Sequence, residues 1–170
     1  MKTILACEGI SEVFLLKSLL KRGHLSCEGE IFLDEPIVAR QLKKVLPLIN
    51  ALPLDEEINV FRIGDTQKDE LSLKGLELRK KSIHLFAYCT KPELEILIII
   101  NEGLYHEYSK LAREVRPKEF VKQHFKGLSL EEYFETHDMY QAILEYKSLK
   151  KHRKGELYLA DLLVPTKRLH

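Results

Sequence analysis

The stretch Ile4-Leu5-Ala6-Cys7-Glu8-Gly9-Ile10-Ser11-Glu12 decides how the chain begins to fold. Its apolar first half predicts a buried strand, and Gly9 permits a sharp turn directly after that strand. Ser11 can cap the apolar-periodic helix that follows. The stretch therefore predicts a strand, a tight turn and a helix, with Glu8 at the strand tip and Glu12 in the first helical turn.

Of the two glutamates, only Glu12 has an ordinary structural explanation. Open α/β folds place their chemistry at the carboxyl ends of the strands, which is where Glu8 is expected. Acids near a helix N-terminus also complement the helix dipole, so Glu12 can be read as a structural acid as well as a ligand. Glu8 has no capping duty at a strand tip and is the stronger candidate for chemistry.

The composition indicates one soluble domain. The chain has 170 residues, of which 45% are hydrophobic and 31% charged, with a net charge of +1. The chain has no overall excess of basic residues that would indicate nucleic-acid binding, although a local stripe of basic residues can still bind nucleic acid. The three cysteines Cys7, Cys27 and Cys89 lack CxxC spacing and are typical of reduced cytosolic thiols. No apolar run is as long as a membrane span, and no signal peptide fits before the first strand, so we expect a cytoplasmic protein.

Strands and helices alternate through the first half of the chain, which implies parallel pairing and a sheet covered on both faces. We therefore expect an α/β fold with a mainly parallel sheet of about four strands flanked by helices. The expected strands are 3–7, 30–33, 57–63 and 82–89, and the expected helices are 11–21, 34–49 and 70–80.

After Cys89 the pattern becomes helical. Thr90 to Glu93 and Ser129 to Glu132 read as capping boxes, each opening a helix. We expect a single domain over 1–170, with an α/β core over 1–113 and a helical C-terminal part over 114–170. The expected helical segments are 92–111, 117–125, 129–151 and an amphipathic piece at 155–163.

A second group of acids follows the third expected strand. Asp65 stands at that strand's tip and Asp69 lies just beyond it, although Gly-Asp followed by polar residues is also a common turn. Glu95 lies just inside the helix after the fourth strand, where a helix-start acid is also ordinary. If the strands are neighbours, these acids and Glu8 form a candidate Mg²⁺ or Mn²⁺ site, because hard carboxylate oxygens suit such ions.

The first stretch resembles the opening of the Toprim domain, the catalytic module of topoisomerases, primases and related nucleases. Glu8-Gly9-x-Ser11-Glu12 between an apolar strand and an apolar helix is most similar to the Toprim branch of the overcoming-lysogenization-defect (OLD) nucleases. Asp65 matches the first aspartate of that family's Asp-x-Asp step. Gln67 stands where the family has its second aspartate, and Asp69, two residues later, is the candidate replacement for that aspartate.

Two later segments resemble the same group. The block Lys91-Pro92-Glu93-Leu94-Glu95 is similar to the Pro-x-aromatic-Glu step of small standalone Toprim-like proteins found near defence genes. Lys154 resembles the family's late lysine before a Leu-Ala helix.

The resemblance implies metal-dependent phosphoryl transfer on DNA or RNA, in defence or DNA maintenance. Glu8 would act as a ligand or as a general acid/base, and Lys154 would neutralise charge on the phosphate. The implied metal ligands are Glu8, Glu12, Asp65, Asp69 and Glu95.

The run from Lys147 to Lys154 is the one local basic cluster. It can track a phosphate backbone without reading sequence, or it can be a solvated helix end. The candidate nucleic-acid contacts are Lys147, Lys150, Lys151 and Arg153.

Two other functions stay open. A non-catalytic Toprim-like module could bind a separate ATPase, since the chain has no GxxxxGK[ST] of its own. A Mg²⁺-dependent hydrolase of small phosphoesters would instead need a closed pocket around the acids. The sequence leaves the oligomeric state open.

Overall fold

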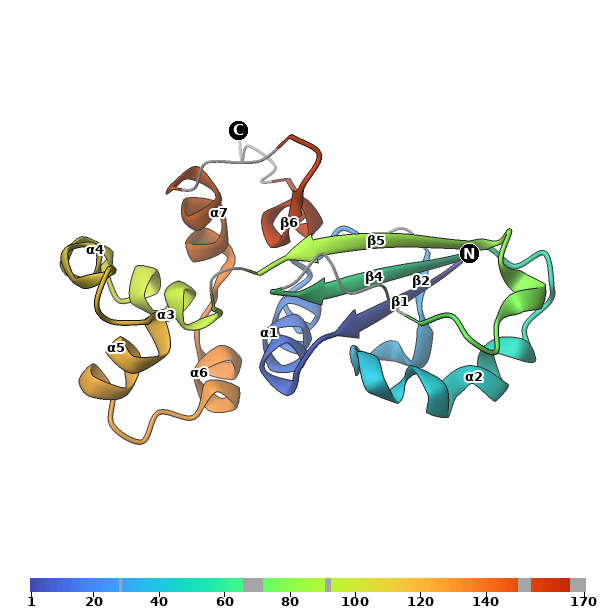
Figure 1. Cartoon of the computed structure of the whole chain (residues 1–170), viewed down its shortest axis with the longest axis horizontal. Helices are drawn as coiled ribbons and strands as arrows, with labels where there is room; N and C mark the ends of the chain where they lie inside the picture. Colours follow the sequence, from blue (N-terminus) through green and yellow to red (C-terminus); the bar gives the residue numbers. More distant parts are fainter. Residues whose placement is uncertain (28, 66–71, 91–92, 150–153, 166–170) are drawn as a thin grey trace.

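The fold is α/β, with a mainly parallel sheet flanked by helices, and it confirms the predicted class (Figure 1). The computed structural model describes residues 1–27, 29–65, 72–90, 93–149 and 154–165. The strands are β1 (Lys2–Cys7), β2 (Glu30–Ile31), β3 (Ile37–Val38), β4 (Ile58–Gly64), β5 (Ile83–Cys89) and β6 (Leu157–Tyr158). The helices are α1 (Ile10–Lys21), α2 (Leu42–Asn50), α3 (Glu95–Asn101), α4 (Tyr105–Leu111), α5 (Pro117–His124), α6 (Leu130–Thr136) and α7 (Tyr140–Leu149).

The sheet has the order β2-β1-β4-β5-β6, and β3 also pairs with β1. Every pairing between these strands is parallel. Cys7 pairs with Ile63, and Gly64 pairs with Cys89, so the three long strands β1, β4 and β5 end at one edge. The residues that follow β1 and β4 are therefore brought together by the topology itself.

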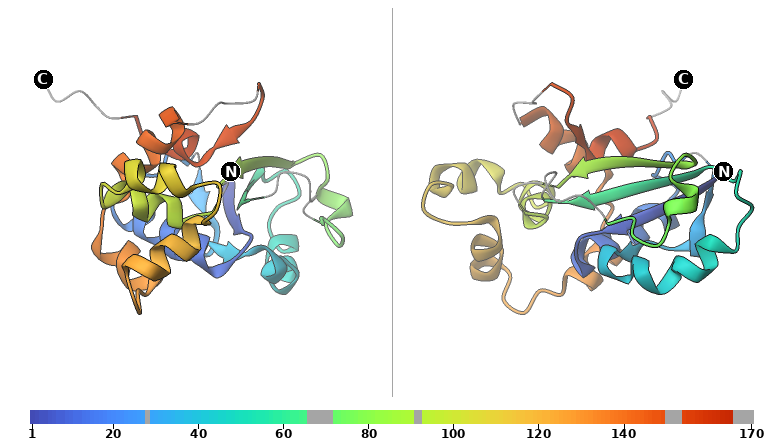
Figure 2. Two further views of the ribbon diagram at one scale, coloured as in Figure 1. Left: turned by 60° about the vertical axis from the view of Figure 1, so that its left-hand side comes forward. Right: turned by 45° about the vertical axis from the view of Figure 1, so that its right-hand side comes forward.

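Side chains alternate between two hydrophobic layers. Leu5 and Cys7 of β1 face a large cluster that includes α1, α3, α5, α6 and α7. Ile4 and Ala6 face a smaller cluster that includes α2. Figure 2 shows α3 to α7 gathered beyond the carboxyl ends of the strands, while α2 covers the sheet nearer its other end.

The C-terminal helices share the larger cluster with the sheet. Phe120 of α5 and Phe134 of α6 are fully buried in the same cluster as Leu5 and Leu16. Helix α6 packs on α1, while α5 and α7 pack on α3. None of the helices in the described ranges combines the length and the apolar character needed to cross a membrane.

The helix predicted over 34–49 was wrong in its first half. Ile37 and Val38 form β3 beside Ala6 and Cys7, and the helix begins only at Leu42. The residue before a proline avoids the helical region, and Glu35 before Pro36 is extended, with φ −150° and ψ 156°. β-Branched Ile37 and Val38 then suit a strand.

Three other predicted helices are shorter than expected. Gly103, with φ +72°, ends α3, so that α4 starts separately. The segment expected at 129–151 divides into α6 and α7, although Ser129 Oγ caps α6 by accepting from Glu132 N–H at 3.3 Å. Of the segment expected at 70–80, residues 70–71 lie outside the described ranges, and the rest contains only a 3₁₀ turn, η3 (Glu77–Arg79).

The last predicted piece, 155–163, forms β6 and a 3₁₀ turn, η4 (Leu159–Leu162), in place of a helix. Strand β6 pairs with the tip of β5 through Tyr88 and Cys89. Of the first predicted capping box, Lys91 and Pro92 lie outside the described residues, and α3 begins at Glu95.

Candidate functional site

Glu8 and Asp65 lie side by side at the carboxyl edge of the sheet. Each follows directly after its strand, β1 or β4, and those strands are paired in parallel along their length. Glu8 N–H donates to the carbonyl of Ile63 at 2.8 Å, which extends the pairing beyond β1. Asp65 N–H donates to Glu8 Oε2 at 3.0 Å. The neighbouring placement of these two acids, expected from the sequence, is therefore present.

Gly64 makes room for the Glu8 side chain. A Cβ atom at position 64 would lie 2.2 Å from Glu8 Oε2 and 2.8 Å from Glu8 Cβ. Both contacts are far shorter than atoms tolerate, so any larger residue would displace the carboxylate. The sequence suggested only a turn at Gly64-Asp65, whereas the glycine also sets the position of Glu8.

Glu12 completes a group of three carboxylates. Gly9 is the N-cap of α1, and its N–H donates to Glu12 Oε2 at 3.2 Å. Burial raises the pKa of Glu12, and the charges of Glu8 and Asp65 raise it further, while backbone hydrogen bonds act in the opposite direction. The three acids therefore share one electrostatic environment, in which a cation would relieve mutual repulsion.

The donor chemistry of this group fits Mg²⁺ better than its geometry does. Among the described residues, no group of three or more His, Cys, Asp or Glu side chains is placed to hold a metal ion. One oxygen of Glu8 and one of Glu12 already accept backbone hydrogen bonds. Mg²⁺ is commonly held by only one or two carboxylates, with water and phosphate completing its shell. Asp69 and Gln67 lie outside the described residues.

The third predicted acid, Glu95, is half-buried in the first turn of α3. Helix α3, which begins at Glu95, follows β5 and lies beyond the carboxyl ends of the strands (Figure 1). Its neighbour Glu93 has a structural contact, because Glu93 Oε2 accepts from Lys118 N–H at 3.0 Å. The role of Glu95 as a metal ligand stays a prediction.

Of the predicted basic residues that the structure describes, Lys154 lies across the sheet from Glu8. Lys154 is exposed in the turn before β6, and β4 and β5 separate that strand from β1. Three strand spacings of about 4.8 Å place β6 roughly 14 Å from β1. Lys147 of α7 forms an ion pair with Asp161, so its charge is compensated within the fold. Lys150, Lys151 and Arg153 lie outside the described residues.

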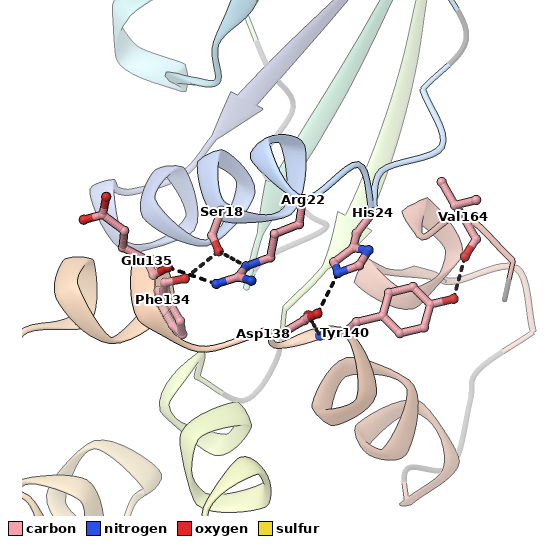
Figure 3. A network of polar contacts seen from close by, with 8 residues as sticks. All are labelled: Ser18, Arg22, His24, Phe134, Glu135, Asp138, Tyr140 and Val164. Atoms are coloured by element: carbon pink, nitrogen blue, oxygen red, sulfur yellow. Dashed lines mark hydrogen bonds and ion pairs between the residues drawn. The ribbon is translucent and has the colours of Figure 1, made fainter.

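A second polar cluster was missed by sequence reasoning. It joins the end of α1 to the α6–α7 connection (Figure 3). His24 Nε2 lies 2.9 Å from Asp138 Oδ2, and Arg22 Nη2 donates to the Glu135 carbonyl at 3.0 Å. Its members are far apart in the sequence, and none belongs to a motif. His24 and Asp138 line a surface hollow of about 310 Å³.

Comparisons with protein-family models, with curated proteins and with solved structures find no match to this chain. The Toprim resemblance therefore rests on the residues named above.

Proposed function

We propose that the acidic edge formed by Glu8, Glu12 and Asp65 binds a hydrated Mg²⁺ or Mn²⁺ ion and supports phosphoryl transfer on nucleic acid, as a Toprim-type nuclease. The observation that carries the proposal is the convergence of three carboxylates, from β1, α1 and β4, on one electrostatic neighbourhood. Such concentrated negative charge is costly without a cation, and it lies where open α/β folds place their ligands.

The roles follow from the setting of each acid. Asp65 is exposed at the strand tip, and Glu12 is half-buried behind it, so Asp65 would meet the ion first and Glu12 would support it. Glu8, also exposed, would complete the ligands or move a proton to or from the reacting group. A bound ion would supply Lewis-acid polarisation of the scissile phosphate.

Substrate binding would use the predicted basic run. Lys147 is already paired with Asp161, so Lys150, Lys151 and Arg153 are the members proposed to contact the phosphate backbone. Such contacts are salt-dependent and indifferent to sequence. We also place the protein in the cytoplasm, which its three free cysteines support.

A second candidate is a non-catalytic Toprim-like module that binds a separate ATPase. It is favoured by the absence, within the described ranges, of a preformed group of three metal ligands. Gln67, which stands in place of the family's second aspartate, also favours this non-catalytic module.

Calorimetry with each ion, together with cleavage assays on DNA, RNA and a small phosphoester, tests the proposal. We expect ion binding and metal-dependent cleavage of a nucleic acid, with Glu8→Gln and Asp65→Asn each lowering cleavage about 100-fold or more. The matched control is Glu114→Gln, which removes an exposed acid after α4 and should leave both signals unchanged. Absence of both binding heat and cleavage would refute the nuclease and favour the partner-binding module.

A further inference from the structure

The chain leaves β3 at the same edge of the sheet as the three acids. Strand β3 pairs in parallel with the end of β1, with Val38 opposite Cys7. The next residue, Ala39, therefore starts about one strand spacing, roughly 4.8 Å, from Glu8. From there the chain forms a 3₁₀ turn, η2 (Ala39–Gln41), which runs directly into α2. Figure 1 shows the chain entering α2 from beside the arrowhead of β1.

This segment carries three exposed cations and no acid to balance them. The cations are Arg40, Lys43 and Lys44, which we call the basic patch. Residues 36–54 contain no aspartate or glutamate. Within the described part of the chain, none of the three cations forms an ion pair, whereas the lysines of β1, α1 and α7 each pair with an acid. The positive charge of the basic patch is therefore uncompensated by the fold.

The spacing of the three cations places them together on the outer face of η2 and α2. Positions i, i+3 and i+4 are neighbours on a helix surface, while Leu42 and Ile49 are buried on the inner face. At rises of about 2.0 Å per residue in η2 and 1.5 Å in α2, Lys44 lies about 9 Å along the axis from Ala39. Like charges at i and i+4 weaken a helix, so Arg40 and Lys44 destabilise this one unless an anion binds them.

The setting of the basic patch favours a phosphate backbone as its partner. A helix that binds a membrane surface needs a free apolar face, whereas α2 buries its apolar face in the core. Phosphates of one B-form strand follow each other every 3.4 Å or so along the axis, so a patch about 9 Å long can meet several of them. The patch also begins beside the carboxylates proposed to hold a metal ion.

We propose that Arg40, Lys43 and Lys44 bind the phosphate backbone of a nucleic acid and guide it to the acidic edge. The identity of the partner rests on the proposed nuclease function. The patch lies on the β3 side of the acids, whereas Lys154 of the predicted basic run lies on the β6 side. Its positive charge offsets the repulsion between the acids and an approaching phosphate. Sequence reasoning missed the patch because uncharged residues interrupt it.

Fluorescence anisotropy of a labelled single-stranded oligonucleotide tests the patch with the full chain, in EDTA so that no cleavage occurs. In the test variant, Arg40, Lys43 and Lys44 are all changed to glutamine. We expect this variant to bind about tenfold or more weakly than the wild type. The slope of log K against log salt concentration should also fall by about 2, because each lost phosphate contact on a single strand removes about 0.7.

The matched control changes Lys74, Lys80 and Lys81 to glutamine. These residues are also exposed, and the last two precede β5 at the amino end of the strands, away from the acids. The control removes the same charge and should bind within about twofold of the wild type. Equal losses in the two triple variants, or no loss in the test variant, would overturn the proposal. A wild type that binds anionic lipid vesicles but no oligonucleotide would overturn it as well.

The same measurements separate this surface from the nuclease. If the wild type binds in EDTA, the test variant does not, and neither Mg²⁺ nor Mn²⁺ supports cleavage, the basic patch stands and the nuclease fails. Metal-dependent cleavage with the same KM in the wild type and the test variant would show the reverse.

A photo-cross-linker locates the contact directly. p-Benzoylphenylalanine in place of Gln41, which is exposed between the cations, should cross-link the bound oligonucleotide. The same group in place of Leu78, which is 90% exposed on η3, should not. Equal yields at the two positions would contradict the proposal, because the patch would then be no closer to the nucleic acid than a distant surface.

Discussion

At the scale of single residues, the acidic edge holds the carboxylate of Glu12 in an environment that disfavours its negative charge. Burial and two neighbouring carboxylates raise the pKa of Glu12. The folded chain therefore holds a proton at Glu12 more tightly than the unfolded chain does. The contribution of this group to stability is largest at low pH, below the unfolded pKa of about 4.3, and is lost as the pH rises through the folded pKa.

Replacing Glu12 with glutamine should thus stabilise the metal-free protein at neutral pH. The amide can still accept from Gly9 N–H, but it carries no charge. We expect Glu12→Gln to raise the melting temperature by about 1–3 °C at pH 7 in a chelator, with the difference vanishing below about pH 4. Thermal unfolding followed by circular dichroism checks both points. Added Mg²⁺ should then raise the melting temperature of the wild type by more than that of the variant, which keeps Glu8 and Asp65.

Gly64 gives a second prediction at this scale. Gly64→Ala should destabilise the fold by about 1–3 kcal/mol and displace the Glu8 carboxylate, because the new methyl group would lie 2.2 Å from Glu8 Oε2. Denaturant unfolding measures the loss. The control is a double-mutant cycle with Glu8→Gly, which removes both clashing atoms and should make Gly64→Ala much less costly. A full, additive cost in the double variant would show that the clash is not the cause.

At the scale of elements, the end of α1 is fastened to the start of α7. Asp138 Oδ1 accepts from Tyr140 N–H at 3.0 Å, while its other oxygen meets His24 (Figure 3). Burial opposes ionisation of Asp138, but these hydrogen bonds and the charges of His24 and Arg22 hold its pKa below the ordinary value. Its ionised form therefore stabilises the fold above the unfolded pKa, and that stability is lost as the pH falls through the folded pKa.

Asp138→Ala should lower stability by about 1 kcal/mol, the usual cost of losing a capping acceptor. Asp138→Asn keeps that acceptor and removes only the charge, so it should lose less. The difference between wild type and Asp138→Asn should disappear as the pH falls below about 4. Chemical unfolding over a pH series measures this. An alanine variant as stable as the wild type would contradict the role of Asp138.

Local signals explain which elements were predictable. Strands β1, β4 and β5 are apolar runs with clear ends, and Ser129 caps α6 as its motif predicts. Strand β3 was missed because Ile37 and Val38 also fit the apolar face of a helix, and only pairing with β1 decides between the two. Strand β6 was missed because a strand of two residues is too short to show an alternating hydrophobic pattern.

The acidic site was also only partly predictable from the sequence. Glu8 and Asp65 could be paired from sequence because parallel neighbours end at one edge. The role of Gly64 beneath Glu8 could not, because it depends on a contact between strands.

At the scale of the whole molecule, one hydrophobic cluster spans both halves of the chain. Phe134 of α6 is fully buried in the cluster that holds Leu5 of β1 and Leu16 of α1. The division at residue 113 that we expected from the sequence therefore does not separate two cores. Loss of packing in the C-terminal helices should therefore also lower the stability of the sheet.

Phe134→Ala should cost about 3–5 kcal/mol and lower the single melting temperature by roughly 10 °C. Leu111→Ala, at a position 39% exposed on α4, is the matched control and should have little effect. Near- and far-ultraviolet circular dichroism should report one coincident transition for both variants. Two separate transitions would mean that the helices unfold independently of the sheet.

The bridge between Leu25 and Leu163, with Val164 N–H donating to the His24 carbonyl at 2.8 Å, has a consequence for synthesis in the cell. These partners are separated by almost the whole described chain, so the bridge cannot close until Leu163 has emerged from the ribosome. Until then, α1 and the sheet present apolar surface that η4 will later cover. Contacts between distant segments form slowly, and exposed apolar surface invites aggregation. The nascent chain should therefore bind a ribosome-associated chaperone until Leu163 and Val164 have emerged.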